Sequence, residues 1–300
     1  MSLLYFFEQL RNPVLDFFML TVTHLGEEML FVGLAVLFLW CIDKYEGYYL
    51  LSVGFLGGQI NQLLKVTFRI DRPWIRDPNF TAVEKAIPGA EGYSFPSGHT
   101  QSAVGVYGGI ARWTDKRFLR WLCIAIALVV PLSRMYLGVH TPLDVGVSVV
   151  LALLLIFVLH PLFSKREQND KWIRVFFWGL FIWSVLQLLF MEFFPFPADS
   201  KVKELESALE AAYKMGGAML GFVLSYEIDR RWIHYRTEGV WWAQIIKLVL
   251  GLGLTLGIKE LVYLLPGGLP IKGLAYCLMV LFIGAGWPLT FPWFAKLGKK

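Results

Sequence analysis

Two histidines and three cationic side chains stand beside apolar segments of this 300-residue chain. The cations are Lys65, Arg72 and Arg134, and the histidines are His99 and His140. A guanidinium group matches phosphate oxygens in two-point geometry, and an imidazole can act as a nucleophile or exchange a proton near neutral pH. Together these residue types indicate chemistry on a phosphate ester.

The residues around His99 predict the start of a helix that can bind an anion. Ser97 directly precedes an apolar helical run, where serine is a favourable N-cap, and Gly98 lets the backbone approach a ligand closely. Amide N–H groups at the N-terminus of a helix favour a bound anion. We therefore expect Ser97 and Gly98 to bind phosphate together with the three cations.

The residues around His140 predict an oriented nucleophile. Thr141 and Pro142 suit the cap and first residue of a helix, which places His140 just before it and Asp144 in its first turn. If Asp144 accepts the Nδ1 proton of His140, Nε2 is left as an unprotonated nucleophile that can form a phosphohistidine. His99 would protonate the leaving group and then act as a base toward water. This chemistry requires no metal ion and no cofactor.

Each of these residues also has a plainer interpretation. Asp144 could complete a capping box with Thr141. Lys65 could extend from a helix end to the membrane interface, and Arg72 could lie in a solvated loop or contact lipid head groups. His99, taken alone, suits a structural histidine.

The residues also follow a known order and spacing, written KxxxxxxRP, PSGH and SRxxxxxHxxxD. In this pattern the chain resembles the type 2 phosphatidic acid phosphatase (PAP2) family, and no signature position is altered. The resemblance implies that His140, His99 and Asp144 are catalytic. It also implies phosphate binding by five other residues of the signature, Lys65, Arg72, Ser97, Gly98 and Arg134. The phrases NPVLDFF, THLGEE and LWCIDK further resemble bacterial members with an added helical C-terminal part.

The composition indicates a membrane protein. Hydrophobic residues make up 56% of the chain and charged residues 17%, which is too apolar for an ordinary globular protein. We expect an all-α fold, a polytopic transmembrane helix bundle with about nine spans, because about 20 mostly apolar residues cross a bilayer. The expected spans lie near residues 27–42, 47–68, 99–113, 118–137, 142–163, 173–194, 208–226, 240–264 and 272–294.

Three regions follow from this pattern. Residues 1–25 are apolar but interrupted by charges, which favours an interfacial helix, with a tenth span as the alternative. From the family resemblance, residues 26–194 would form a six-helix catalytic core. Residues 195–300 would then add further transmembrane helices.

The distribution of basic residues predicts the orientation in the membrane. Loops at 112–120, 165–171, 230–236 and 296–300 are basic and fall on one side of a nine-span bundle, which marks the cytoplasmic side. The loop at 69–98 is also basic but falls on the opposite side, and an anion site there would explain the exception. The site would then face the extracytoplasmic side of a multi-pass protein of the cell membrane.

The leading interpretation, drawn from the resemblance, is a lipid phosphatase. Its substrate would be phosphatidic acid, phosphatidylglycerol phosphate or undecaprenyl diphosphate, with a sphingoid-base phosphate next. A lipid phosphotransferase and a lipid transporter or flippase are the alternatives. The expected partners are the lipid phosphate and the bilayer, and not nucleic acid, because the basic residues form short clusters between apolar runs. Glycines at 216, 217 and 221 favour close helix packing or a homodimer.

Overall fold

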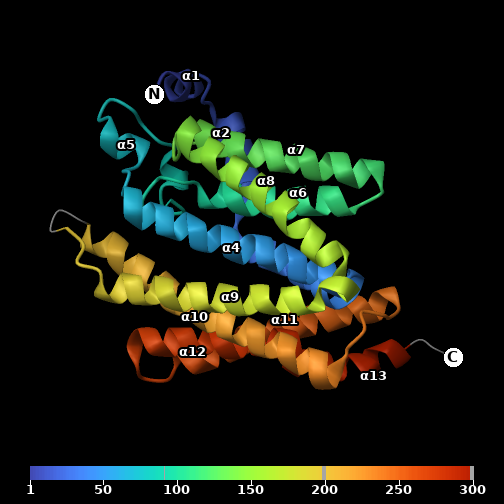
Figure 1. Ribbon diagram of the computed structural model, residues 1–300. Helices are drawn as coiled ribbons and strands as arrows, with labels where there is room; N and C mark the ends of the chain where they lie inside the picture. The colour runs from blue at the N-terminus through green and yellow to red at the C-terminus, as the bar shows by residue number, and fades with distance from the viewer. Residues whose placement is uncertain (91, 198–200, 298–300) are drawn as a thin grey trace. The chain divides into compact units, whose positions relative to one another are not determined.

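The computed structural model describes residues 1–90, 92–197 and 201–297 (Figure 1). Within these ranges the chain forms helices and no strand, which confirms the all-α prediction. Every segment predicted to be a span is helical there. The basic residues Lys299 and Lys300 lie outside the described residues.

The helices follow one another along the whole chain. The first part contains α1 (Ser2–Gln9), α2 (Pro13–Thr23), η1 (His24–Gly26), α3 (Glu28–Leu37), the π-helix η2 (Phe38–Ile42), α4 (Lys44–Phe68), α5 (Pro73–Arg76), η3 (Glu84–Ala86), α6 (Gly98–Trp113), α7 (Arg117–Tyr136) and α8 (Pro142–Ser164). The second contains α9 (Arg166–Phe193), α10 (Val202–Ile228), the π-helix η4 (Asp229–Ile233), α11 (Trp241–Tyr263), α12 (Gly268–Leu281), the π-helix η5 (Phe282–Gly286), η6 (Trp287–Thr290) and α13 (Phe291–Lys296).

The chain folds into two compact units that interleave along the sequence. Unit 1 comprises Met1–Ala35, Tyr49–Pro161 and Ser200–Glu204. Unit 2 comprises Val36–Tyr48, Leu162–Asp199 and Leu205–Lys300. The predicted regions 1–25, 26–194 and 195–300 were defined by function and membrane placement. The compact units reflect spatial packing alone, so these boundaries stay a prediction.

Several helices are long and apolar enough to cross a membrane. In the described residues there are four by length and composition, Arg117–Tyr136, Pro142–Ser164, Gln168–Phe193 and Gly268–Lys296. A fifth arises if Pro13–Gly26 and Glu28–Ile42, which meet at a bend of 50°, count as one broken span. The bundle is therefore a multi-pass membrane protein, and the count of about nine spans stays a prediction.

In unit 1, the N-terminal helices pack against the C-terminal end of α7 and the loops beside it. Leu4 is fully buried in a cluster with Phe80, Met135 and Val145. Arg11 donates from NH1 to the carbonyl oxygen of Thr81 at 2.7 Å. Burying apolar side chains is the main favourable term in such packing. Helices α1 and α2 therefore cover the region from which the loop 137–141 begins.

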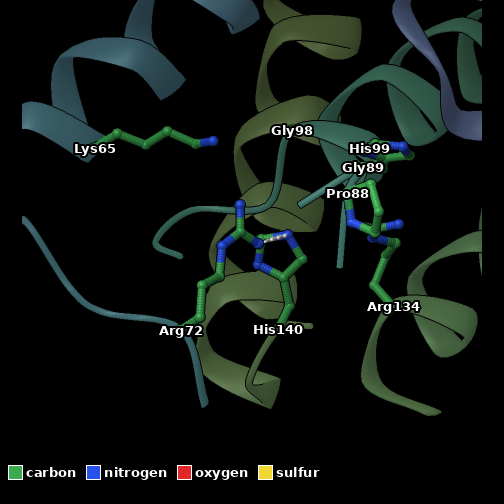
Figure 2. Close-up of a pocket in the computed structure, with 8 residues that line it drawn as sticks. All are labelled: Lys65, Arg72, Pro88, Gly89, Gly98, His99, Arg134 and His140. Carbon is green, nitrogen blue, oxygen red and sulfur yellow. Dashed lines mark hydrogen bonds between the residues drawn. The ribbon is translucent and has the colours of Figure 1, made fainter. Parts of the chain in front are cut away.

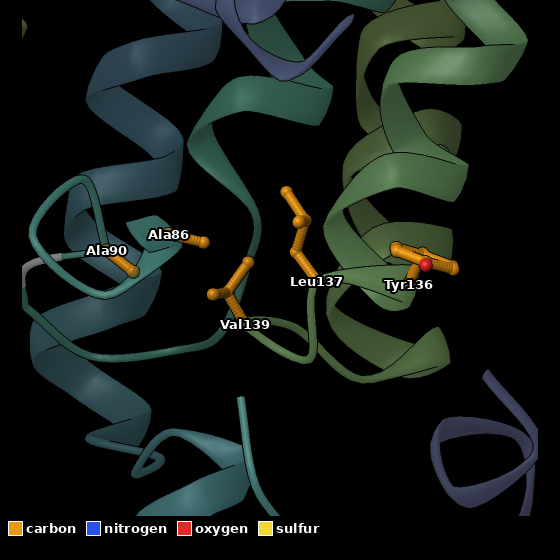
Figure 3. Packing of buried hydrophobic residues seen from close by; sticks show 5 residues of the cluster. All are labelled: Ala86, Ala90, Tyr136, Leu137 and Val139. Atoms are coloured by element: carbon orange, nitrogen blue, oxygen red, sulfur yellow. The ribbon is translucent and has the colours of Figure 1, made fainter. Parts of the chain in front are cut away.

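The loop between α7 and α8 is fixed by its own apolar side chains. Leu137 and Val139 are fully buried beside Ala86, Ala90 and Tyr136 (Figure 3). The backbone N–H of Val83 also donates to the carbonyl oxygen of Leu137 at 3.0 Å. A loop that buries alternate side chains has little freedom, so the backbone that leads to His140 is held in one position.

Unit 2 is built around aromatic and glycine contacts. Tyr48 and Phe177, whose ring centroids are 5.8 Å apart, are both fully buried. Glycines 217 and 221 of α10 meet the backbone of α12, because a Cβ added at Gly217 would lie 1.9 Å from the carbonyl oxygen of Gly273. The prediction of close helix packing at these glycines is confirmed, and the contact is made inside the chain.

Candidate active site

A cavity of about 270 Å³ lies in unit 1 (Figure 2). Of the eight residues predicted to act at the site, all except Ser97 and Asp144 line it, together with two residues that the sequence did not indicate, Pro88 and Gly89. The lining residues are Lys65, Arg72, Pro88, Gly89, Gly98, His99, Arg134 and His140. The structure thus brings together three cations and two imidazoles around one small space.

Each side chain reaches the cavity from the end of an element. Lys65 lies in the last turn of α4, and Arg72 is the N-cap of α5. His99 lies in the first turn of α6, Arg134 in the last turn of α7, and His140 just before α8. Figure 2 shows the amine of Lys65 and the guanidinium of Arg72 directed toward the region of the two histidines. Side chains in the middle of a helix pack against neighbouring helices, whereas side chains at a helix end can point into a cavity.

Ser97 supports the site from behind. Its hydroxyl accepts a hydrogen bond from the amide of Thr100 at 3.4 Å, which confirms the predicted N-cap of α6. Its own amide donates to the carbonyl oxygen of Asp144 at 3.2 Å. Ser97 is fully buried and does not line the cavity, whereas Gly98 does. The start of α6 therefore faces the cavity through Gly98 and His99, where the helix N-terminus favours an anion.

His140 is held in the tautomer that a nucleophile requires. NH1 of Arg72 lies 2.9 Å from Nε2 of His140, and the imidazole is only 2% exposed. A guanidinium group can only donate, so Nε2 must accept and the proton is assigned to Nδ1. NH1 of Arg72 also donates to the carbonyl oxygen of Val139 at 3.0 Å, which ties the guanidinium to the same loop.

Asp144 lies beside His140 but is bonded elsewhere. Its Oδ2 is 3.5 Å from Nδ1 of His140, which is longer than a hydrogen bond. The same oxygen accepts from the hydroxyl of Ser94 at 2.6 Å and from the amide of Thr141 at 2.7 Å. The amide of Asp144 donates to the hydroxyl of Thr141 at 3.3 Å, which completes the capping box. Asp144 therefore forms the capping box, and the predicted hydrogen bond to Nδ1 is not formed in this structure. Its catalytic role stays a prediction.

The surroundings keep His140 uncharged. Burial lowers the pKa of His140 well below its ordinary value, and the nearby cations Arg72, Arg134 and Lys65 lower it further. Burial also lowers the pKa of Arg72 to about 10, so its guanidinium remains charged near neutral pH. A neutral imidazole surrounded by cations retains its lone pair across the physiological pH range.

Arg134 is a second buried guanidinium, 2% exposed, and its NH1 donates to the hydroxyl of Thr23 at 2.7 Å. Its Nε has no hydrogen-bond partner among the described residues. A buried donor without a partner costs free energy unless a ligand or water completes it. Arg134 therefore has hydrogen-bonding capacity left beside the cavity.

Sequence reasoning did not find two residues that hold the site. Ser94 contacts Asp144 across 50 positions, and Thr23 contacts Arg134 across 111. No spacing rule connects residues so far apart, so only the fold reveals these pairs. In the part of the chain that the structure describes, no group of three or more His, Cys, Asp or Glu side chains could hold a metal ion.

Two separate stretches of the chain match models of known protein families. Residues 46–168 match the model of the PAP2 superfamily, and residues 213–300 match that of the PAP2 superfamily phosphatase, transmembrane extension. Phosphatidylglycerophosphatase B of Bacillus subtilis (strain 168) is 30% identical over 174 residues, which cover 53% of this chain and 80% of that protein. No solved structure matches the chain.

Two other relatives differ in how much of them the chain covers. Undecaprenyl-diphosphatase BcrC of Bacillus subtilis (strain 168) is 29% identical over 152 residues, or 49% of this chain and 75% of the relative. The probable sphingosine-1-phosphate phosphatase of Dictyostelium discoideum is 29% identical over 156 residues, or 48% of this chain and 37% of the relative.

Proposed function

This chain belongs to the PAP2 superfamily, and we propose that it hydrolyses a lipid phosphate or diphosphate through a phosphohistidine on His140. The observation that carries the proposal is the position of His140. Its Nε2 is an acceptor facing Arg72, in a cavity that Lys65 and Arg134 also line. Cations around a neutral nucleophile suit attack on a phosphate anion.

In the first half-reaction, Nε2 of His140 attacks phosphorus. Arg72 transfers its NH1 hydrogen bond from Nε2 to a phosphate oxygen, which frees the lone pair. The bond between phosphorus and Nε2 forms while the bond to the leaving oxygen breaks. His99 enters this step as an imidazolium, which the charge of the bound phosphate favours, and gives its proton to that oxygen. Asp144, 3.5 Å from Nδ1 in the resting site, stabilises the positive charge that develops on the imidazole of His140.

In the second half-reaction, water attacks the phosphohistidine. His99, now neutral, accepts a proton from the water, the bond between phosphorus and Nε2 breaks, and inorganic phosphate leaves. Lys65, Arg72, Arg134 and the backbone at Gly98 hold the phosphate oxygens throughout, and Ser97 caps the helix that begins there. After the first half-reaction the dephosphorylated lipid moves away into the bilayer. Water can then reach the phosphohistidine.

The size of the cavity bears on the substrate. Its volume of about 270 Å³ lies below the range of about 300–1,000 Å³ that is typical for drug-sized ligands. Such a cavity suits a phosphate or diphosphate head group and leaves the lipid tail outside. We propose a prenyl diphosphate, phosphatidylglycerol phosphate or phosphatidic acid as substrate, with a sphingoid-base phosphate next, in line with the relatives' names.

The proposed placement follows from the charges. We propose about nine spans in the cytoplasmic membrane of a bacterium, because about 20 apolar residues cross a bilayer, with the site on the extracytoplasmic face. The basic loops at 112–120, 165–171 and 230–236 support this orientation. A homodimer stays a prediction, and the glycine contacts at 217 and 221 that motivated it are made within the chain.

The test compares the wild type with His140→Ala and a matched control, His160→Ala. His160 lies on α8 within 3.1 Å of Arg112 and does not line the cavity. Each purified protein is incubated in detergent with a prenyl diphosphate, a glycerolipid phosphate or a sphingoid-base phosphate. EDTA is present throughout, and the release of phosphate is measured. A ³²P-labelled substrate is quenched in base to trap an acid-labile phosphohistidine.

We expect wild type and His160→Ala to release phosphate and carry the label, and His140→Ala to do neither. Full activity in His140→Ala would overturn its role as nucleophile. Label that appears in a lipid or sugar acceptor would identify the phosphotransferase alternative. A wild type that is silent on every lipid would overturn the proposed reaction, and lipid transport would be measured next.

A further inference from the structure

A short N-terminal turn, η1 with the preceding Thr23, contacts two residues that line the cavity. The hydroxyl of Thr23 accepts the hydrogen bond from NH1 of Arg134 at 2.7 Å. Thr23 is 6% exposed, so water competes little for this bond. Both residues belong to unit 1, and the hydroxyl is the only hydrogen-bond partner of the Arg134 guanidinium among the described residues.

The same turn contacts the start of α6. A Cβ added at Gly26 would lie 2.8 Å from the carbonyl oxygen of His99 and 2.7 Å from Cγ1 of Val130. Real Cβ atoms do not approach backbone this closely, so any larger residue would push η1 away from His99. Gly26 therefore sets how closely the turn approaches the histidine.

The neighbouring charged pair lies outside this contact. Nδ1 of His24 is 2.5 Å from Oε1 of Glu27, and the two side chains are 67% and 47% exposed. An exposed pair contributes little to stability. The turn thus has a polar outer side, His24 and Glu27, and an inner side, Thr23 and Gly26, that contacts the cavity lining.

We propose that Thr23 is a positioning residue for phosphate capture, which holds the guanidinium of Arg134 in place without cancelling its charge. The inference rests on the proposed phosphate site. A carboxylate at this position would hold the guanidinium as firmly, but it would neutralise the charge that the substrate must meet. A hydroxyl orients one N–H and leaves the remaining donors, including the unpartnered Nε, to the phosphate.

The test uses substitutions that separate orientation from charge. Thr23→Val keeps the shape and removes the hydroxyl, Thr23→Ser keeps the hydroxyl, and Thr23→Asp supplies a carboxylate. Thr21→Val on the same helix is the matched control, because the hydroxyl of Thr21 is exposed and, among the described residues, bonds only to the carbonyl oxygen of Phe17. Two readouts are taken, lipid phosphate hydrolysis and direct calorimetric binding of vanadate.

We expect Thr23→Val to lose about 10- to 100-fold in kcat/KM and in vanadate affinity, as for loss of one hydrogen bond to a charged group. Thr23→Ser should recover most of both, Thr23→Asp should lose at least as much as Thr23→Val, and Thr21→Val should match the wild type. The inference is overturned if Thr23→Val equals Thr21→Val, or if Thr23→Ser does not recover binding. If Thr23 served only to hold Arg134 in place, Thr23→Asp should lose less than Thr23→Val, because its carboxylate also accepts the hydrogen bond.

A double-mutant cycle tests whether Thr23 acts through Arg134. In an Arg134→Gln background, Thr23→Val should cause no further loss of vanadate affinity, because its target is gone. An equal loss in both backgrounds would overturn the inference. Vanadate binding is measured without lipid. The role of Thr23 can therefore be judged even if the protein does not hydrolyse any of the lipids.

A second pair of substitutions tests the turn if Thr23→Val does not fold. Gly26→Ala should displace η1 and lower vanadate affinity, whereas Gly33→Ala, where an added Cβ meets nothing within 4 Å, should not. Equal affinity in the two variants would overturn the role of the turn.

Discussion

Arg134 in unit 1 and Lys247 in unit 2 are both buried cations bound to a neutral oxygen. NH1 of Arg134 donates to the hydroxyl of Thr23 at 2.7 Å, and Nζ of Lys247 donates to the carbonyl oxygen of Trp40 at 2.7 Å. Arg134 lines the cavity, and its Nε has no partner among the described residues. Lys247 is fully buried, with its amine 4.2 Å from the centroid of the Phe291 ring.

The difference lies in what remains open to a ligand. The carbonyl oxygen and the aromatic ring satisfy Lys247, so its charge stabilises the end of η2 against α11 within unit 2. Some other cations of unit 2 pair with carboxylates, as Lys44 does with Asp229 at 2.6 Å. A buried charge becomes a binding group only where part of its hydrogen-bonding capacity faces a cavity.

The largest expected effect comes from replacing each of the two buried cations by a neutral residue. Arg134→Gln should lower kcat/KM by about 10²- to 10³-fold, the usual cost of losing a group that stabilises transition-state charge. Lys247→Met should leave kcat/KM within about twofold of wild type, because the substrate does not meet it. Phosphate release from the best substrate measures both. Comparable losses in the two variants would break the comparison.

A smaller effect is expected from the carboxylates. Asp144→Asn should lower kcat by about 10²-fold, because the developing imidazolium of His140 loses its counter-charge. Asp229→Asn, which breaks the pair with Lys44 in unit 2, should lower thermal stability and leave kcat unchanged. If Asp144→Asn retains wild-type kcat, the carboxylate serves only as the cap of α8.

The pH profile sharpens the comparison further. Burial and nearby cations depress the pKa of His140, so the acid limb of kcat/KM in the wild type should lie well below pH 6.5. Arg72→Gln removes one of those cations, so the pKa of His140 rises and the acid limb moves to higher pH. Lys44→Gln in unit 2 should leave the limb in place. An acid limb that does not move in Arg72→Gln would show that this cation does not set the titration.

The smallest effect concerns stability. Lys247→Met leaves the carbonyl oxygen of Trp40 without its donor, which should cost on the order of 1–3 kcal/mol, with some of that offset by apolar packing. Thermal unfolding in detergent measures the shift against Lys259→Met, a lysine whose pair with Glu260 is partly exposed. A Tm for Lys247→Met that equals the control would mean that the buried lysine does not stabilise unit 2.

Local features of the chain were predictable because they depend on nearby residues. The caps at Ser97 and Thr141, the proline that begins α8 and the helical character of the apolar runs all follow from neighbours within a turn. The number of membrane spans was harder to predict. In the described residues four or five helices are long and apolar enough to cross a membrane, fewer than the nine expected from the sequence. Buried polar side chains and bends make a helix in the bundle less apolar than a single span needs.

By itself, then, the sequence determined an all-helical membrane protein and most of the residues that line the candidate site, because residue type and short spacing carry that information. The tertiary structure alone decided that Ser94 donates to Asp144, that Arg134 donates to Thr23, and that Pro88 and Gly89 line the cavity. The physical reason is distance along the chain. Contacts between residues 50 or 111 positions apart arise from the packing of whole helices, which no local pattern encodes.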